Sequence, residues 1–168
     1  MTEPAPSPAP IAPDHAGPRI REYGGDDMDA VMEIMNAAFD PPYGEAWTRS
    51  QCAGILPMAG VTLRIAEDAA GAIAGFALIR TIADEAELLL IAVDPGAQHR
   101  GIGAALVDDF RAFAKSRGAG RLHLEVRDGN SAIILYERAG FALVGRRRDY
   151  YRGRDGHKRD ALTLALEL

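Results

Sequence analysis

A glycine-containing turn at residues 93–106, VDPGAQHRGIGAAL, is the stretch of this sequence best suited to hold a ligand. A helix that begins at a glycine turn presents unpaired backbone N–H groups and the positive end of its dipole. Arg100 adds a positive charge, and no carboxylate follows before Asp108. These features predict a site for a phosphate or pyrophosphate group. The alternative is that Gly101 and Gly103 only make a tight connection between a strand and a helix.

Two common phosphate-binding motifs do not match this turn. A P-loop requires Lys and then Ser or Thr after its second glycine, where this sequence has Ala104 and Ala105. A Rossmann fingerprint requires Gly or Ala where Leu106 stands, and it follows the first strand of a parallel unit. Here the turn follows the third strand of a predicted meander, so a nucleoside triphosphate is not the expected ligand.

Glu125, in the segment LHLEVR, is a carboxylate placed where it could transfer a proton. The alternating apolar residues of this segment share one face of a predicted strand, so Glu125 faces the other way. His123 lies on the same face as Glu125. Two ligands without a third do not make a metal site, so no metal is expected.

The spacing of apolar residues predicts one mixed α/β domain in which these groups are positioned. An acidic turn, ADEA, joins the third and fourth strands and favours an antiparallel meander. Asp26 or Asp27 is expected to cap the first helix, and Thr48 to begin the second. Strands are expected over residues 19–23, 61–68, 72–82, 86–93, 118–126, 141–151 and 160–168, and helices over 26–39, 48–56, 101–117 and 131–140.

The composition fits a single domain with a substantial core. Of the 168 residues, 48% are hydrophobic, and 24 acidic against 19 basic residues give a net charge of −5. That balance argues against a general binder of polyanions, so nucleic acid is not expected as a direct partner. No segment approaches 18 uninterrupted apolar residues, so no membrane association is expected.

Cys52 is the only cysteine, which excludes a disulfide framework within the chain and fits a reducing compartment, with the cytoplasm as the expected location. It has no recognisable base partner, so covalent catalysis is not indicated. The first 18 residues, MTEPAPSPAPIAPDHAGP, are rich in Pro and Ala and predict a disordered tail. The folded domain is expected over residues 19–168.

Three segments together resemble the GNAT superfamily of N-acetyltransferases, in particular its RimI-type ribosomal-protein acetyltransferases: IAVDPGAQHRGIGAALVDDF, LEVRDGNSAIILYERAGF and RRRDYYRGRDGHKRDALTLAL. The resemblance runs from about residue 20 to residue 168. It implies a strongly twisted mixed sheet of about seven strands with about four helices. It also implies acetyl-coenzyme A as donor, coenzyme A as product, and direct attack by a protein amino terminus, such as that of a ribosomal protein.

The resemblance also assigns cofactor-binding positions. The turn matches the family's pyrophosphate loop, and the strand before it matches the segment whose backbone pairs with the pantetheine arm. Asn130 matches a side chain that contacts the cofactor, although a helix-capping role is an equally good interpretation. The positions in the loop and strand are Gln98, His99, Arg100, Gly101, Ile102, Gly103 and Ala104, preceded by Ile91, Ala92 and Val93.

By the same resemblance, Glu125 is the general base and Tyr136 the general acid that protonates the departing thiolate. The segment NSAIILY is one residue shorter than in RimI-type chains, which leaves open a packing role for Tyr136. A predicted basic hairpin with its turn near Asp155 and Gly156 would flank the acceptor. Three tyrosines are candidates for acceptor binding: Tyr43, Tyr150 and Tyr151.

Two other functions remain open from the sequence. The first is acetylation of small-molecule amines, which an acidic acceptor pocket including Asp84, Glu85 and Glu87 would favour. The second is a coenzyme A-binding module without catalysis. The presence of both Glu125 and Tyr136 argues against the second function.

Overall fold

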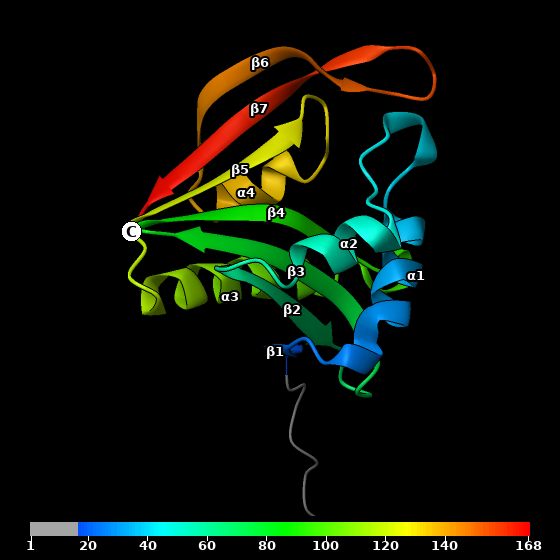
Figure 1. Cartoon of the computed structure of the whole chain (residues 1–168), viewed down its shortest axis with the longest axis vertical. Helices are drawn as coiled ribbons and strands as arrows, with labels where there is room; N and C mark the ends of the chain where they lie inside the picture. Colours follow the sequence, from blue (N-terminus) through cyan, green and yellow to red (C-terminus); the bar gives the residue numbers. More distant parts are fainter. Residues whose placement is uncertain (1–16) are drawn as a thin grey trace, which may run out of the picture.

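The structure, a computed structural model, describes residues 17–168, which form one seven-stranded sheet in the order β1-β2-β3-β4-β5-β7-β6 (Figure 1). The predicted mixed α/β fold is confirmed, and the predicted bounds differ from the observed ones by no more than three residues. The strands are β1 (Arg19–Glu22), β2 (Val61–Glu67), β3 (Ile73–Ile82), β4 (Glu85–Val93), β5 (Arg121–Arg127), β6 (Ala142–Arg152) and β7 (Lys158–Glu167); the helices are α1 (Met28–Ala38), α2 (Arg49–Ile55), α3 (Ile102–Ser116) and α4 (Ile133–Arg138).

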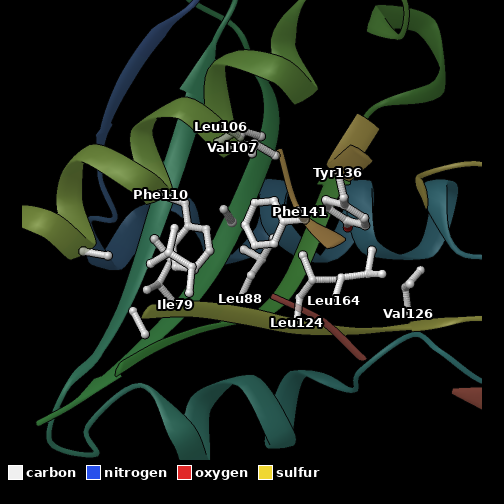
Figure 2. Close-up of a cluster of buried hydrophobic side chains, with 14 of the residues drawn as sticks. Ile79, Leu88, Leu106, Val107, Phe110, Leu124, Val126, Tyr136, Phe141 and Leu164 are labelled. Carbon is white, nitrogen blue, oxygen red and sulfur yellow. The ribbon is translucent and has the colours of Figure 1, made fainter. Parts of the chain in front are cut away.

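Helices cover both faces of the sheet, as Figure 1 shows. Successive strand residues alternate between two cores, so Ile79 packs in the core beneath α3 and α4 while Leu78 packs beneath α1 and α2. Figure 2 shows the first core, in which Phe110 of α3 lies among buried side chains of the sheet. This double cover explains why the central strands β3 and β4 are nearly continuous apolar runs.

The sheet divides between β4 and β5, its only parallel pair within the described residues. That ladder begins at Glu85 opposite Arg121 and ends at Leu88 opposite Leu124. Beyond it, β4 continues along β3 while β5 continues along β7. The edge of β4 at residues 89–93 and the edge of β5 at residues 125–127 are therefore not paired with each other.

Two helix starts test the predicted caps. Thr48 begins α2 as expected: its Oγ1 accepts a hydrogen bond from the Gln51 backbone N–H (3.2 Å), and the Gln51 side chain accepts one from the Thr48 N–H (2.7 Å). The side-chain cap predicted for the first helix is wrong. Asp27 stands at the N-cap of α1, but its carboxylate accepts from the Gly24 N–H (2.7 Å) and pairs with Arg21.

Most of the predicted tail, residues 1–18, lies outside the described residues. Within residues 17–168, no helix is both long and apolar enough to span a bilayer. The cytoplasmic location stays a prediction.

Candidate active site

The turn after β4 leaves backbone N–H groups free at the start of α3. Gly101 is the N-cap of α3 at φ +82°, and the first intrahelical bond runs from the Ala105 N–H to the Gly101 carbonyl (3.0 Å). The N–H groups of Ile102, Gly103 and Ala104 therefore precede that bond and have no carbonyl partner within α3. No acidic side chain stands in the first turn. A pyrophosphate group fits this arrangement of donors.

The two glycines of the turn have different structural roles. A Cβ on Gly101 would meet no atom within 4 Å, so glycine is required there for the left-handed conformation rather than for space. A Cβ on Gly103 would lie 3.3 Å from Leu135 Cδ2 and 3.8 Å from Val93 Cγ2. Gly103 therefore lets the start of α3 approach α4 and the end of β4. His99 is also left-handed (φ +62°), which helps the chain reverse into the helix.

The strand residues assigned to the cofactor lie in the unpaired part of β4. Ile91, Ala92 and Val93 pair with β3 on one side, whereas the ladder to β5 has already ended at Leu88. Leu89 is the extra residue of a β-bulge, because Leu78 pairs with Leu90 and the next residue of β3 pairs with Leu88. The backbone of residues 89–93 thus has no strand partner on the β5 side and can pair there with an extended ligand leading toward Gly101, although the Gln98 side chain donates to the Val93 carbonyl oxygen (3.4 Å).

Asn130 stabilises the turn before α4. Its side-chain oxygen accepts from the Ala132 N–H (2.9 Å), and its backbone carbonyl accepts from the Ile133 N–H (3.2 Å). This is the capping interpretation of Asn130, although the assigned N-cap of α4 is Ala132. The contact with the cofactor stays a prediction.

Glu125 is the first residue of β5 beyond the ladder to β4, and it faces away from buried Leu124 and Val126 as the alternation predicted. Its carboxylate accepts a hydrogen bond from Arg147 Nη1 at 2.7 Å; the Glu125 side chain is 24% exposed and the Arg147 side chain 56% exposed. The Arg147 guanidinium also lies 4.1 Å from the centre of the Tyr150 ring. Arg147 belongs to the segment RRRDYYRGRDGHKRD of the predicted basic hairpin, and its contact with Glu125 was not predicted from the sequence.

Tyr136 is the only buried residue of α4, at 5% exposure. Figure 2 shows its ring in the core beside Phe141, and the two rings meet edge-on with their centres 6.2 Å apart. Burial raises the pKa of the Tyr136 hydroxyl well above its usual range, with smaller contributions from Tyr151 and Glu45. Tyr136 therefore has a packing role, and its hydroxyl keeps its proton at physiological pH.

Tyr43 and Tyr151, two of the candidate acceptor-binding residues, lie near an ion pair between Glu45 and Arg127 that was not predicted from the sequence. Glu45, from the loop between α1 and α2, pairs with Arg127 at the end of β5 (3.3 Å). The Tyr43 ring lies 3.7 Å from the Arg127 guanidinium carbon. Burial, followed by the negative charges of Glu45 and Glu125, raises the pKa of Tyr151 to about 12. One feature of the sequence could have indicated that Arg127 belongs to the site: it lies two residues after Glu125 and therefore on the same face of the strand.

A bulge in β6 gives Tyr150 and Tyr151 different surroundings: Tyr150 lies within the bulge, and Tyr151 is the residue at which pairing with β7 resumes. Arg147 pairs with Ala161 and Tyr151 with Arg159, so four steps along β6 span only two steps along β7. Asp149 within the bulge is left-handed (φ +56°), and its N–H donates to the Asp160 carboxylate (3.1 Å). As a result Tyr150 lies exposed against Arg147, while Tyr151 turns partly inward.

The acidic residues proposed for a small-amine pocket are not gathered at this site. Glu85 lies at the opposite end of β4 from Val93, beside Arg121 (3.2 Å). Glu87 binds Arg80 (2.5 Å). Among residues 17–168, no group of three or more His, Cys, Asp or Glu side chains could hold a metal ion.

Comparison with known proteins identifies the family. The family described as acetyltransferase (GNAT) matches residues 28–141. The chain belongs to the GNAT acetyltransferase family. The predicted GNAT membership and fold are therefore confirmed.

Similar proteins narrow the comparison within the GNAT family. The ribosomal protein bS18-alanine N-acetyltransferase of Escherichia coli (strain K12) is 43% identical over 99 residues, which are 58% of this chain and 66% of that protein, just under two thirds. The Salmonella typhimurium (strain LT2) protein of the same name is 38% identical over 143 residues, covering 84% of this chain and 92% of that one. The crystal structure of the ribosomal-protein-S18-alanine N-acetyltransferase from Escherichia coli has a TM-score of 0.79 at 32% identity, covering 89% of this chain and 93% of that chain. The predicted likeness to RimI-type acetyltransferases is confirmed.

Proposed function

We propose that this GNAT chain transfers an acetyl group from acetyl-coenzyme A to the amino-terminal α-amine of a protein, with the alanine terminus of a ribosomal protein as the first candidate acceptor. The observation that carries the proposal is the end of the β4–β5 ladder at Leu88 and Leu124. From this point the free edge of β4 leads to the amide groups of α3, and Glu125 is the next residue of β5. The names of the similar proteins support the choice of acceptor.

Acetyl-coenzyme A, when bound, supplies an acetyl group activated as a thioester. Backbone amides of residues 101–104 would hold the pyrophosphate, with Gln98, His99 and Arg100 beside them. The backbone of residues 91–93 would pair with the pantetheine arm, and Asn130 would contact the cofactor from the turn before α4.

Glu125 would remove a proton from the acceptor. An ammonium group has no lone pair, so an α-amine can attack only after losing a proton, and a positioned carboxylate can accept it directly or through water. The Arg147 partner of Glu125 is itself exposed to solvent, which weakens the ion pair, so an incoming ammonium group can compete for the same carboxylate.

Tyr136 would donate a proton to the leaving sulfur. The hydroxyl carries the proton at physiological pH, but burial raises its pKa and so makes it a weaker acid, and donation then requires the departing thiolate to be held directly beside it. Tyr43, Tyr150 and Tyr151 would contact the acceptor, with Tyr43 and Tyr151 beside Arg127 and Tyr150 beside Arg147.

The decisive experiment measures thioester consumption with peptides that begin with alanine, peptides with a blocked amino terminus, and small amines. One peptide should carry both an α-amine and a lysine, and mass spectrometry should locate the acetyl group. At pH 7 an α-amine with a pKa of about 8 is roughly 10% neutral, while a lysine with a pKa of about 10.4 is roughly 0.04% neutral. We expect the α-amine to be modified. Faster turnover of small amines would favour the alternative acceptor class, and cofactor binding without any turnover would indicate a non-catalytic module.

A further inference from the structure

We propose that Glu45 and Arg127 form a positioning pair that holds the loop of residues 41–45 across the ends of β5 and β7, and thereby sets the affinity for the acceptor. The inference rests on the proposed function, because acceptor affinity is its main readout. Neither residue is assigned this role by the resemblance to the GNAT family.

The contact between Glu45 and Arg127 is the most buried ion pair of the described residues. Arg127 Nε lies 3.3 Å from Glu45 Oε2, and each side chain is only 11% exposed. The contact is ionic, because the buried Arg127 Nε makes no hydrogen bond with suitable geometry. Arg64 and Asp109, which join β2 to α3 away from this loop, form the next most buried pair, at 16% and 19% exposed. Removing one member of a buried pair leaves the other charge without its partner, so the loss of either residue should release the loop.

Tyr43 connects the same loop to β7. The guanidinium carbons of Arg127 and Arg159 lie 3.7 and 4.7 Å from the centre of the Tyr43 ring. Such contacts favour a fixed ring position. Arg159 is itself held by the Asp155 carboxylate, with its Nη1 3.2 Å from Oδ1. The loop is therefore tied to β5 by one arginine and to the β6–β7 hairpin by another.

Backbone contacts bring the loop and the hairpin close together. A Cβ on Gly153 would overlap the Pro42 carbonyl oxygen, and one on Gly44 would lie 3.1 Å from the Arg152 carbonyl oxygen. Gly44 is left-handed (φ +68°), which only glycine adopts without strain. Figure 1 shows the loop between α1 and α2 reaching toward the closed end of this hairpin.

The pair also lies close to the groups expected to handle the acceptor. The negative charge of Glu45 contributes to the raised pKa values of both Tyr136 and Tyr151. Glu125 lies two residues before Arg127 on the same strand face. Displacement of the loop would therefore alter the acceptor side of the site and leave the turn at Gly101 intact.

The test compares Glu45→Gln and Arg127→Met with a matched control, Asp109→Asn, which breaks the Arg64 pair instead. Initial rates are measured with an alanine-starting peptide over a range of both substrates. We expect the two pair variants to raise KM for the peptide about tenfold, with kcat and KM for acetyl-coenzyme A within twofold of the parent. The double variant should be no worse than either single variant, because both remove one interaction. Asp109→Asn should change thermal stability only.

A second readout does not depend on turnover. The N–H groups of Tyr43 and Gly44 donate within the loop, to the carbonyl oxygens of Asp40 and Pro41. Their hydrogen exchange, followed by mass spectrometry, should be faster in Glu45→Gln than in the parent and unchanged in Asp109→Asn, because the loop gains freedom. If the parent acetylates no peptide, the proposed function fails, and the exchange still decides whether the pair holds the loop.

Three results would overturn the inference: peptide KM within twofold of the parent in both pair variants, an effect on KM equal to that of Asp109→Asn, or a loss confined to kcat. Should Arg127→Met fail to fold, Glu45→Ala removes the carboxylate from the other side of the pair and should also raise KM for the peptide about tenfold. An unchanged KM in Glu45→Ala would contradict the inference.

Discussion

Arg147 Nη1 lies 2.7 Å from Glu125 Oε1, so the carboxylate expected to act as the base has a cationic partner within the chain itself. The guanidinium comes from β6, whereas the carboxylate stands at the first residue of β5 beyond its ladder with β4. An acceptor ammonium must therefore compete with Arg147 for Glu125.

Replacing Arg147 should improve acceptor binding. The Arg147 guanidinium is exposed to solvent, which screens its attraction for the Glu125 carboxylate, so the pair should weaken acceptor binding by only a few-fold. We expect Arg147→Gln to lower KM for the peptide by two- to fivefold, as measured from initial rates at low ionic strength. Arg146→Gln is the control, because Arg146 pairs with Asp128 and Asp160 instead. A higher KM in Arg147→Gln would mean that Arg147 binds the acceptor itself.

Replacing Glu125 should impair proton removal. Positioned proton transfer contributes about 10²- to 10⁴-fold, so Glu125→Gln should lower kcat/KM by that range at neutral pH. Raising the pH should restore part of the loss, because more of the amine is then already neutral. The measurement is a pH–rate profile of parent and variant. Near-parental activity at pH 7 would show that another group, or water alone, removes the proton.

Tyr136→Phe separates catalysis from packing. The substitution keeps the ring against Phe141 and removes only the hydroxyl, so melting temperature at pH 7 should change little. If the hydroxyl protonates the leaving group, kcat should fall by about 10²-fold or more and high pH should not restore it. Steady-state rates between pH 7 and 9 decide the question. A kcat within a fewfold of the parent would leave Tyr136 with its packing role alone.

The buried tyrosines should make the fold sensitive to alkali. A tyrosine ionises near pH 10 when unfolded, and burial raises the pKa of Tyr136 in the folded chain. Above pH 10 the unfolded state therefore binds fewer protons than the native state, and the free energy of unfolding falls as pH rises. Urea unfolding at pH 9 and 11 should show a smaller loss for Tyr136→Phe than for the parent. Equal losses would mean that Tyr136 ionises normally in the fold.

Ligand protection tests the turn at Gly101. Acetyl-coenzyme A at a hundredfold excess over its Kd should stabilise the native state by about 2.7 kcal/mol, while ATP should not. Gly101→Val should abolish the thermal shift, because φ +82° is forbidden to a β-branched residue. Gly118→Val is a matched control at the other end of α3, where φ is +87° and space is equally open. It should lower the melting temperature and keep the shift; equal shifts from both nucleotides would remove the cofactor assignment.

The elements and the ligand-binding turn were predictable because their signals are local. The apolar periodicity of residues 102–116 indicates a helix, and the glycine turn at its start indicates free backbone amides. Both signals are independent of where the helix packs in the fold. The contacts of Glu125 with Arg147 and of Glu45 with Arg127 were not predictable in the same way. Each joins residues at least 22 positions apart, and the loop containing Glu45 has no periodicity from which its path could be inferred. The failed cap at Asp27 has a similar cause, since Arg21 and the Gly24 N–H compete for its carboxylate.

The strands β4 and β5 form a wedge-shaped gap, and the short ladder between them is its narrow end, the vertex. The parallel ladder pairs residues 85–88 with 121–124, next to the hydrogen bond from the Gly120 N–H to the Asp84 carbonyl (2.7 Å), and β4 extends a further five residues, about 16 Å, beyond the last pair. A rotation of β4 relative to β5 by about 4° at the vertex would displace the far end of β4, about 16 Å away, by about 1 Å. A misplacement of reacting groups by about 1 Å can lower a catalytic rate about 100-fold. For the proposed reaction, substitutions of Leu88 and Leu124, which are buried at the end of the ladder, are therefore expected to alter the alignment of groups that neither leucine touches.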